Sequence, residues 1–312
     1  MAGGARYGLD GSRSPAAVRW AYSFDSAIAT PDSRFVVIYQ RLGTKALLLK
    51  GRSVVRELNR SFYHADVYEY PICLVPRGDR TLLIHCPDDY NRLEVEDAET
   101  GERLTQRQSK ASDFFHSRLR ANPSGTRLLS AGWVWHPLDA VVFFDIDLAL
   151  REPQHLDRID WHTAPSRHVG LVEENSACWQ DENFAIVTGG EDQEDEEAAA
   201  EHALELRLRP NGVIVYDTSN KTVRSACVLE QPAGTVMPIG DTHIIAFYRH
   251  PRLVRLNDGH VEKEWPDIAS GEQLSSILLP TGSLPPLALD VPNARFAVAA
   301  SDGIRVVRVA IS

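Results

Sequence analysis

The sequence predicts an all-β fold built from six copies of one unit, and two observations support this prediction. The first is a short turn between two apolar runs, at Pro31-Asp32-Ser33, which returns five more times along the chain. The second is the spacing, since the turns begin at positions 31, 76, 123, 179, 238 and 292. Proline presets the turn geometry, and Gly, Asn, Asp and Ser close it. The β-branched and aromatic residues on both sides favour strands, so each copy is predicted to hold a β-hairpin.

A second hairpin is predicted downstream of several of these turns. Residues 92–104, 213–223 and 253–261 each follow a strand-like pattern, turn, and resume it. Four short strands in a unit that repeats every 40 to 50 residues or so are typical of one blade of a β-propeller. The predicted fold is therefore a β-propeller with six blades. Seven blades are the alternative, if residues 265–284 hold further strands.

The order of these features resembles the WD40-like β-propeller superfamily. In that pattern a Pro-Asp-Gly-like turn precedes two strands, the second ends in Asp, and a Thr-Gly turn follows, as at Asp97 and Thr100-Gly101. The resemblance covers nearly the whole chain and implies a rigid disc that presents loops to other proteins. No unit ends in Trp-Asp or opens with Gly-His, so the hydrogen-bonded tetrad of that superfamily is not carried over. No finer family is assigned.

The even spread of the turns over 312 residues predicts a single propeller domain, residues 16–312, after a flexible N-terminal lead, residues 1–15. The fourth unit carries an acidic insert at about 190–207, interpreted as a solvated helix start or loop in preference to a metal site. The last unit offers only three strands, at 287–291, 295–301 and 303–309. Because an open edge strand invites aggregation, an N-terminal strand at 16–24 is predicted to complete the last blade and close the ring.

Composition restricts the classes of partner. The net charge is −10 and the isoelectric point is about 5.6, which disfavours general nucleic-acid binding. No apolar stretch has the length of a membrane span or of a signal peptide, so no membrane contact and a cytoplasmic location are expected. The four cysteines form no Cys-x-x-Cys pair and are expected to be reduced thiols.

No catalytic, phosphate-binding or metal-binding motif occurs in the sequence, so no catalytic residue, cofactor or metal is predicted. His155, Asp157, Asp160 and His162 lie close together, but their spacing matches no established metal site. Asp145 and Asp147 are expected to be solvated or to cap a turn. Propeller enzymes draw their groups from several blades and leave little local signal, so an enzyme or small-molecule sensor at one mouth of the channel stays the alternative.

The leading functional hypothesis is a non-catalytic scaffold or accessory subunit that binds another protein. Its candidate binding residues lie in the loops before the innermost strands, which a propeller gathers on one face. Aromatic, His and Arg side chains on one face are typical of a recognition surface; packing between adjacent blades is the alternative interpretation. The candidates are Phe62, Tyr63, His64, Phe114, Phe115, His116, Trp161, His162, Arg167 and His168.

Ring closure predicts the effect of an N-terminal truncation. A variant lacking residues 1–24 is expected to unfold at lower urea concentration than the full chain, because the last blade loses a strand. Circular dichroism during urea titration measures this. Equal midpoints for the two proteins would contradict closure by this segment.

Overall fold

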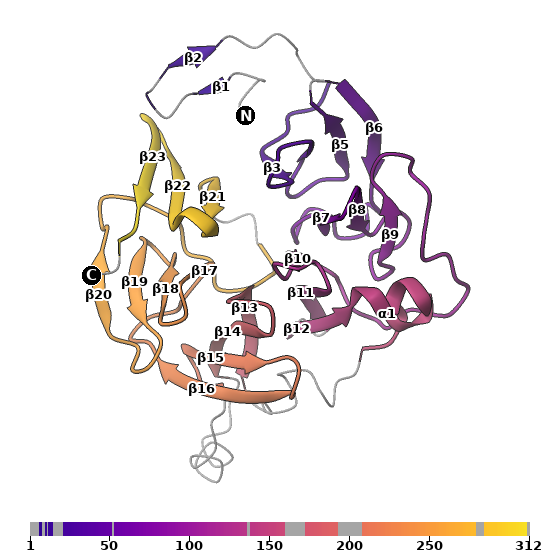
Figure 1. Cartoon of the computed structure of the whole chain (residues 1–312). Helices are drawn as coiled ribbons and strands as arrows, with labels where there is room; N and C mark the ends of the chain where they lie inside the picture. The colour runs from indigo at the N-terminus through magenta and orange to yellow at the C-terminus, as the bar shows by residue number, and fades with distance from the viewer. Residues whose placement is uncertain are drawn as a thin grey trace.

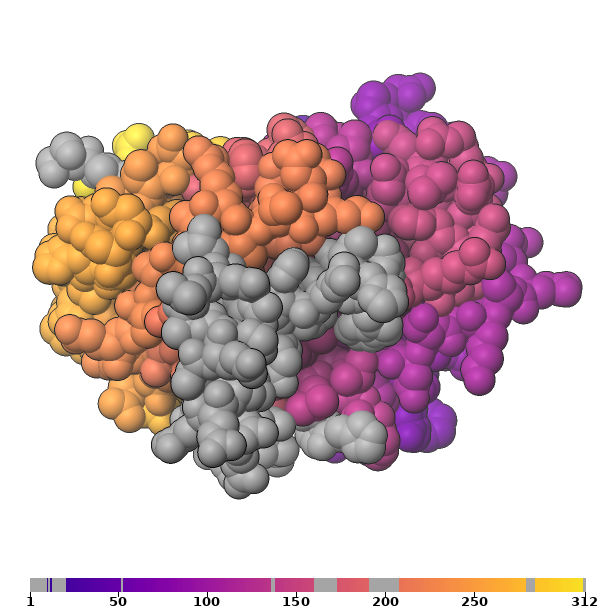
Figure 2. Space-filling view, turned by 90° about the horizontal axis from the view of Figure 1, so that it is seen from below, coloured from indigo at the N-terminus to yellow at the C-terminus, as the bar shows by residue number. Residues whose placement is uncertain are grey.

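The computed structural model describes residues 6–7, 10, 12–14, 21–51, 53–135, 138–159, 172–192, 208–278 and 284–310. Within these residues the fold is all-β, as predicted, with six antiparallel sheets of three or four strands and a separate two-stranded pair. Figure 1 shows the six sheets following one another around a common centre, with β3, β7, β10, β13, β17 and β21 innermost. Figure 2 shows the molecule from its edge, with the orange part of the chain on one side and the magenta and purple part on the other.

The strands of each sheet follow one another in sequence. Sheet 1 holds β3 (Ser26–Ala29), β4 (Phe35–Tyr39), β5 (Lys45–Lys50) and β6 (Ser53–Asn59). Sheet 2 holds β7 (Ile72–Arg77), β8 (Arg80–His85) and β9 (Glu94–Asp97). Sheet 3 holds β10 (Arg120–Ala121), β11 (Arg127–Val134) and β12 (Leu138–Asp145). Sheet 4 holds β13 (Val172–Trp179), β14 (Phe184–Asp192), β15 (Gly212–Asp217) and β16 (Thr222–Val228). Sheet 5 holds β17 (Val236–Ile239), β18 (His243–Ala246), β19 (Arg252–Arg255) and β20 (Val261–Glu264). Sheet 6 holds β21 (Leu287–Asp290), β22 (Arg295–Ala300) and β23 (Gly303–Arg308).

The six recurring turns are confirmed as the links between the first and second strands of the six sheets. At the first turn the Asp32 carboxylate accepts hydrogen bonds from the Thr30 hydroxyl and the Arg34 amide. Ser33 adopts a left-handed backbone conformation, with φ of 56°. The turn chemistry read from the sequence therefore closes these hairpins.

Neighbouring sheets bury apolar side chains between them. On β8, Leu83 packs against Phe35 and the rest of sheet 1, whereas Leu82 and Ile84 pack against Leu128 and the rest of sheet 3. Similar clusters join sheets 3 and 4, sheets 4 and 5, and sheets 5 and 6. Burial on both faces explains why the strands read as continuous apolar runs. All four cysteines are unpaired, as predicted, and three of them are buried in these clusters.

Three sheets, 2, 3 and 6, lack a regular fourth strand. In sheet 2 its place is taken by a single antiparallel bridge between Glu96 and Arg103. In sheet 3 the chain instead forms α1 (Ile146–Arg151) and the short 3₁₀ helix η2 (Pro153–Asp157). Asp145 caps α1 by accepting a hydrogen bond from the Leu148 amide at 2.7 Å, which confirms its predicted capping role. This helix was not predicted from the sequence.

The junction between the last and first sheets is less complete. β1 (Arg6–Tyr7) and β2 (Arg13–Ser14) pair with each other, and residues 21–25 form no strand. Within the described residues, β23 pairs only with β22, and no buried cluster joins sheet 6 to sheet 1. Residues 15–20, and residues 193–207 of the acidic insert, lie outside the described ranges. Ring closure by the N-terminal strand and the number of blades therefore stay predictions.

The free edge of β12 is satisfied by two carboxylates from β13. Glu174 accepts a hydrogen bond from the Val141 amide at 2.7 Å, and Glu173 accepts one from the Asp139 amide at 3.0 Å. These side chains take the place of the carbonyls that a fourth strand would supply. Glu174 is fully buried, and this burial raises the pKa of its carboxyl to about 8.

A raised carboxyl pKa predicts how stability depends on pH. Between about pH 4.5 and pH 8 the folded protein holds a proton on Glu174 that the unfolded chain releases, so stability falls as the pH rises through this range. The contribution is up to about 1.4 kcal/mol per pH unit. Glu174→Gln removes it, so the difference in unfolding free energy between variant and wild type should grow in favour of the variant from pH 5 to pH 8. Urea titration at each pH measures this, and a constant difference would contradict it.

Candidate functional site

Arg60 holds the loop that leads into β7 in place. The buried guanidinium lies over the rings of Tyr68 and Tyr70, at 4.5 and 5.0 Å from their centroids. It also donates hydrogen bonds to four backbone carbonyls, those of Gly43 (2.7 Å), Ala65 (2.6 Å), Tyr68 (3.0 Å) and Glu69 (3.3 Å). Because one side chain binds four carbonyls, the loop has little freedom to move.

This loop carries aromatic side chains into solvent at its tip. The side chain of Phe62 is 87% exposed and that of Tyr63 is 45% exposed. The Ala65 amide donates to the Phe62 carbonyl at 3.1 Å, and His64 takes a left-handed conformation with φ of 52°. The tight turn therefore directs Phe62 and Tyr63 outward.

Aromatic rings from three neighbouring loops gather beside this tip. Tyr63 lies 5.1 Å from Tyr90, and His64 lies 5.4 Å from Trp135, between ring centroids. Trp135, directly after β11, is 49% exposed. The surface formed by Phe62, Tyr63, His64, Tyr90 and Trp135 is called the aromatic patch below.

The aromatic patch rests on a buried pair of stacked rings. Phe115 and Trp133 stack at 3.7 Å between centroids, and Tyr90 stacks on Phe115 at 4.2 Å. The backbones of Phe115 and Trp133 also pair, with hydrogen bonds of 2.8 and 3.2 Å. Gly132 permits this approach, because a Cβ there would lie 1.9 Å from the Phe115 carbonyl oxygen. Sheet 3 thereby supports the patch as a fixed platform.

The structure separates the predicted binding residues into two groups and a remainder. Phe62, Tyr63 and His64 lie in the aromatic patch, whereas Phe114, Phe115 and His116 are buried and support it. His116 contacts the Ser130 hydroxyl at 3.1 Å, and burial lowers the pKa of its imidazole to about 3, so it is uncharged at neutral pH. Trp161, His162, Arg167 and His168 lie outside the described residues.

Tyr90 and Trp135 belong to the aromatic patch but were not predicted. They lie in loops between the second and third strands of sheets 2 and 3, whereas the sequence search considered only the loops before the first strands. A local signal for Trp135 existed, because Trp133 and Trp135 are two residues apart and therefore lie on the same face of an extended segment.

The segment 265–278, called the crossing segment below, runs across the inner ends of several sheets. It passes the inner ends of four sheets in the order 5, 4, 3, 2, as Figure 1 also shows. Its successive contacts are Gln273 with Thr235 (2.6 Å), Leu274 with Asn175 (3.0 Å), Ser276 with Gly132 (3.1 Å) and Leu278 with Val67 (2.7 Å). Ile277 reaches the aromatic patch, since it bridges Tyr68 and packs with the buried rings.

The polar groups beneath the crossing segment are bonded to one another. The Asp139 carboxylate accepts from the Ser276 amide at 3.0 Å and from the Ser276 hydroxyl. Burial raises the pKa of Asp139 to about 6, while Arg118 and Ser276 oppose this rise. The Arg118 guanidinium donates to the Asn175 carbonyl at 2.6 Å. These groups stabilise the crossing segment, and Asp139, Asn175 and Ser276 among them are buried from solvent.

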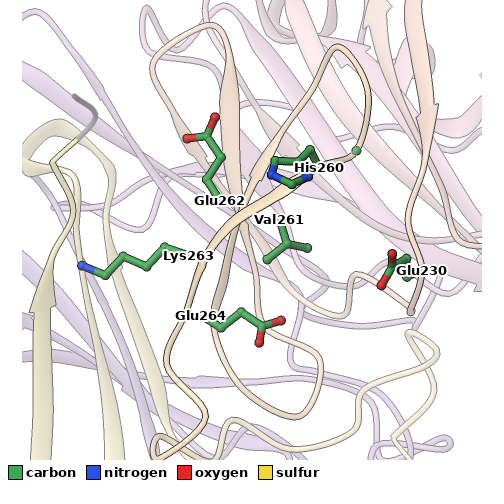
Figure 3. Close-up of a pocket in the computed structure, with 7 residues that line it drawn as sticks. Glu230, His260, Val261, Glu262, Lys263 and Glu264 are labelled. Atoms are coloured by element: carbon green, nitrogen blue, oxygen red, sulfur yellow. The ribbon is translucent and has the colours of Figure 1, made fainter.

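Two surface cavities lie away from the crossing segment. One, of about 610 Å³, is lined by paired charges including Arg103 and Asp88. The other, of about 510 Å³, lies along β20, and Figure 3 shows Lys263 pointing away from Glu230 rather than toward it. Within the described residues no group of three or more His, Cys, Asp and Glu side chains is placed to hold a metal ion. Asp157 instead pairs with Arg107 at 2.7 Å.

Comparison with known proteins supports the fold. No family model matches the chain, and no curated protein sequence does. Among solved structures, one described as the crystal structure of a mitotic checkpoint complex is similar, with a TM-score of 0.61 and 12% sequence identity. The match covers 97% of this chain and 80% of the other. At this identity the likeness shows the fold alone, which is that of a β-propeller.

The described helices are short. None of them combines the length and the apolar character that crossing a membrane requires.

The difference in burial predicts that substitution of two phenylalanines changes the stability of the protein by very different amounts. Phe115→Ala should destabilise the protein by about 3–5 kcal/mol, because it removes the centre of the ring stack. Phe62→Ala should change stability by no more than about 0.5 kcal/mol, because Phe62 is exposed. Thermal and urea unfolding of both variants measure this. A stable Phe115→Ala variant would show that the stack is not a structural support.

Proposed function

We propose that this protein is a non-catalytic β-propeller that binds another protein through the aromatic patch, as a scaffold or accessory subunit. The observation that carries the proposal is the exposure of Phe62, Tyr63 and Trp135 on neighbouring loops, of which the loop of Phe62 and Tyr63 is held by Arg60. Large aromatic side chains lose few rotational states on binding and dominate the energy of protein interfaces. A rigid platform lowers the entropic cost further.

The architecture that we propose for this scaffold is a single domain over residues 16–312 with six blades. The N-terminal strand at 16–24 would complete the last blade, beside the exposed face of β23, where Ile304 and Val306 are solvent-exposed. Residues 1–15 would form a flexible lead. The acidic insert at about 190–207 would lie on the edge of the fourth blade.

The alternative, an enzyme or small-molecule sensor at the channel mouth, receives less support. The crossing segment runs across the inner ends of several sheets, and the polar groups under it are bonded to each other. The similar solved structure is described as a complex. That description is in keeping with an assembly role for this fold, although the fold by itself establishes no function.

A capture experiment tests the proposal. The full chain is tagged in cells that produce it, beside a variant with Phe62→Ala, Tyr63→Ala and Trp135→Ala, and bound proteins are quantified by mass spectrometry. A partner should be recovered with the wild type and reduced about thirtyfold with the variant, since hot-spot residues contribute about 2 kcal/mol or more.

The matched control carries Tyr22→Ala, Val228→Ala and Val291→Ala, which are exposed apolar residues outside the patch. It should retain the partner, and the loss should be reproduced with the purified partner. If the patch variant keeps every partner of the wild type, binding through the patch is refuted.

A further inference from the structure

Three exposed carboxylates adjoin the aromatic patch. Asp113 accepts a hydrogen bond from the Tyr90 hydroxyl at 2.7 Å, which fixes this carboxylate beside the rings. Asp89 directly precedes Tyr90 in the chain. Asp66 lies in the loop that carries Tyr63, and Arg60 binds this loop through the Ala65 carbonyl. The apolar rings of the patch are therefore accompanied by negative charge.

Elsewhere in the described residues, several aromatic rings have a cation of the same chain over them. Such a Lys or Arg lies within 6 Å of the centroids of Tyr22, Phe35, Phe184, Tyr248 and Trp265. Within the same described residues, none lies over Tyr63, Tyr90 or Trp135. Arg60 is nearby, but it lies over Tyr68 and Tyr70 and its donors are engaged by buried carbonyls. Within the described residues the patch thus has ring faces and neighbouring carboxylates but no cation over its rings.

We infer that the aromatic patch binds an arginine side chain presented by the partner protein, with Asp113 as its counter-charge. This inference rests on the proposed function and specifies the chemistry of the partner. A guanidinium stacks on Tyr and Trp faces and donates two parallel hydrogen bonds to a carboxylate. Tyr63 and Trp135 supply partly exposed rings, and Asp113, bonded to the Tyr90 that adjoins Tyr63, supplies the carboxylate. The net charge of −10 favours approach of a basic segment.

Arginine fits this surface better than the other occupants. An aliphatic side chain would use the rings but would strip water from Asp113 without replacing its hydrogen bonds. An acidic segment would be repelled by the three carboxylates. A lysine would gain the charge interaction but lacks the planar stacking and the paired donors.

Two synthetic peptides test the inference on the full chain. One is a glycine-serine peptide with two arginines and an uncharged dye, and the other has citrulline at both arginine positions. Citrulline keeps the shape and removes the charge. Fluorescence anisotropy at low salt should show the arginine peptide binding about tenfold more tightly, with the preference shrinking as salt is raised.

Variants then locate the binding. Asp113→Asn keeps an acceptor for the Tyr90 hydroxyl but removes the charge, and should weaken the arginine peptide about fivefold while leaving the citrulline peptide unchanged. Asp302→Asn makes the same change of net charge at an exposed turn of sheet 6 and should alter neither. Trp135→Ala and Tyr63→Ala should each weaken the arginine peptide.

The outcomes separate this inference from the proposed function. Equal binding of the two peptides, or binding by neither, overturns the arginine inference, while the capture experiment still decides on a protein partner. An arginine preference that survives Trp135→Ala, Tyr63→Ala and Asp113→Asn overturns it as well, because the site then lies elsewhere. An arginine preference lost in these variants, with no partner lost in the capture experiment, upholds the arginine site and refutes the scaffold role.

Discussion

Apolar contact on both faces of each inner sheet is the constraint on which the rest of the structure depends. Each of sheets 2 to 5 packs against a neighbour on either side, so none of these four sheets has a solvated face. The burial of residues such as Leu83 on one face and Leu82 on the other fixes the strand register, because a slip by one residue would exchange the two faces. The sheets therefore hold their loops in a fixed arrangement on the rim of the ring.

The face that carries the aromatic patch is held together by polar contacts between the loops of these sheets. Arg60 binds the loop of Phe62 and Tyr63, and the crossing segment ties sheets 5, 4, 3 and 2 together. Both devices bury hydrogen-bonded groups that would be costly to leave unpaired. Together they hold the aromatic patch in place. The candidate site therefore lies beside the crossing segment and not at the centre of the sheets.

Much of the fold could be predicted, because it is encoded locally. The six turns, the strand runs beside them and the capping role of Asp145 all depend on residues within a few positions of one another. The helix α1 was missed, because the choice between a fourth strand and a helix depends on partners distant in sequence. One of them is Arg77, which pairs with Asp147 at 2.5 Å. The candidate site was half predicted: Phe62, Tyr63 and His64 are in place, but Phe115 and His116 proved to be buried.

The sequence by itself determined the all-β repeat, the positions of its hairpins and the acidic character of the chain, since these depend on composition and on short-range backbone preferences. Only the tertiary structure decided which aromatic side chains reach solvent. Phe62 and Phe115 have similar neighbours in sequence, yet one is exposed and the other lies under Tyr90 and on Trp133. Burial is settled by contacts between residues far apart in the chain, and a local pattern does not contain them.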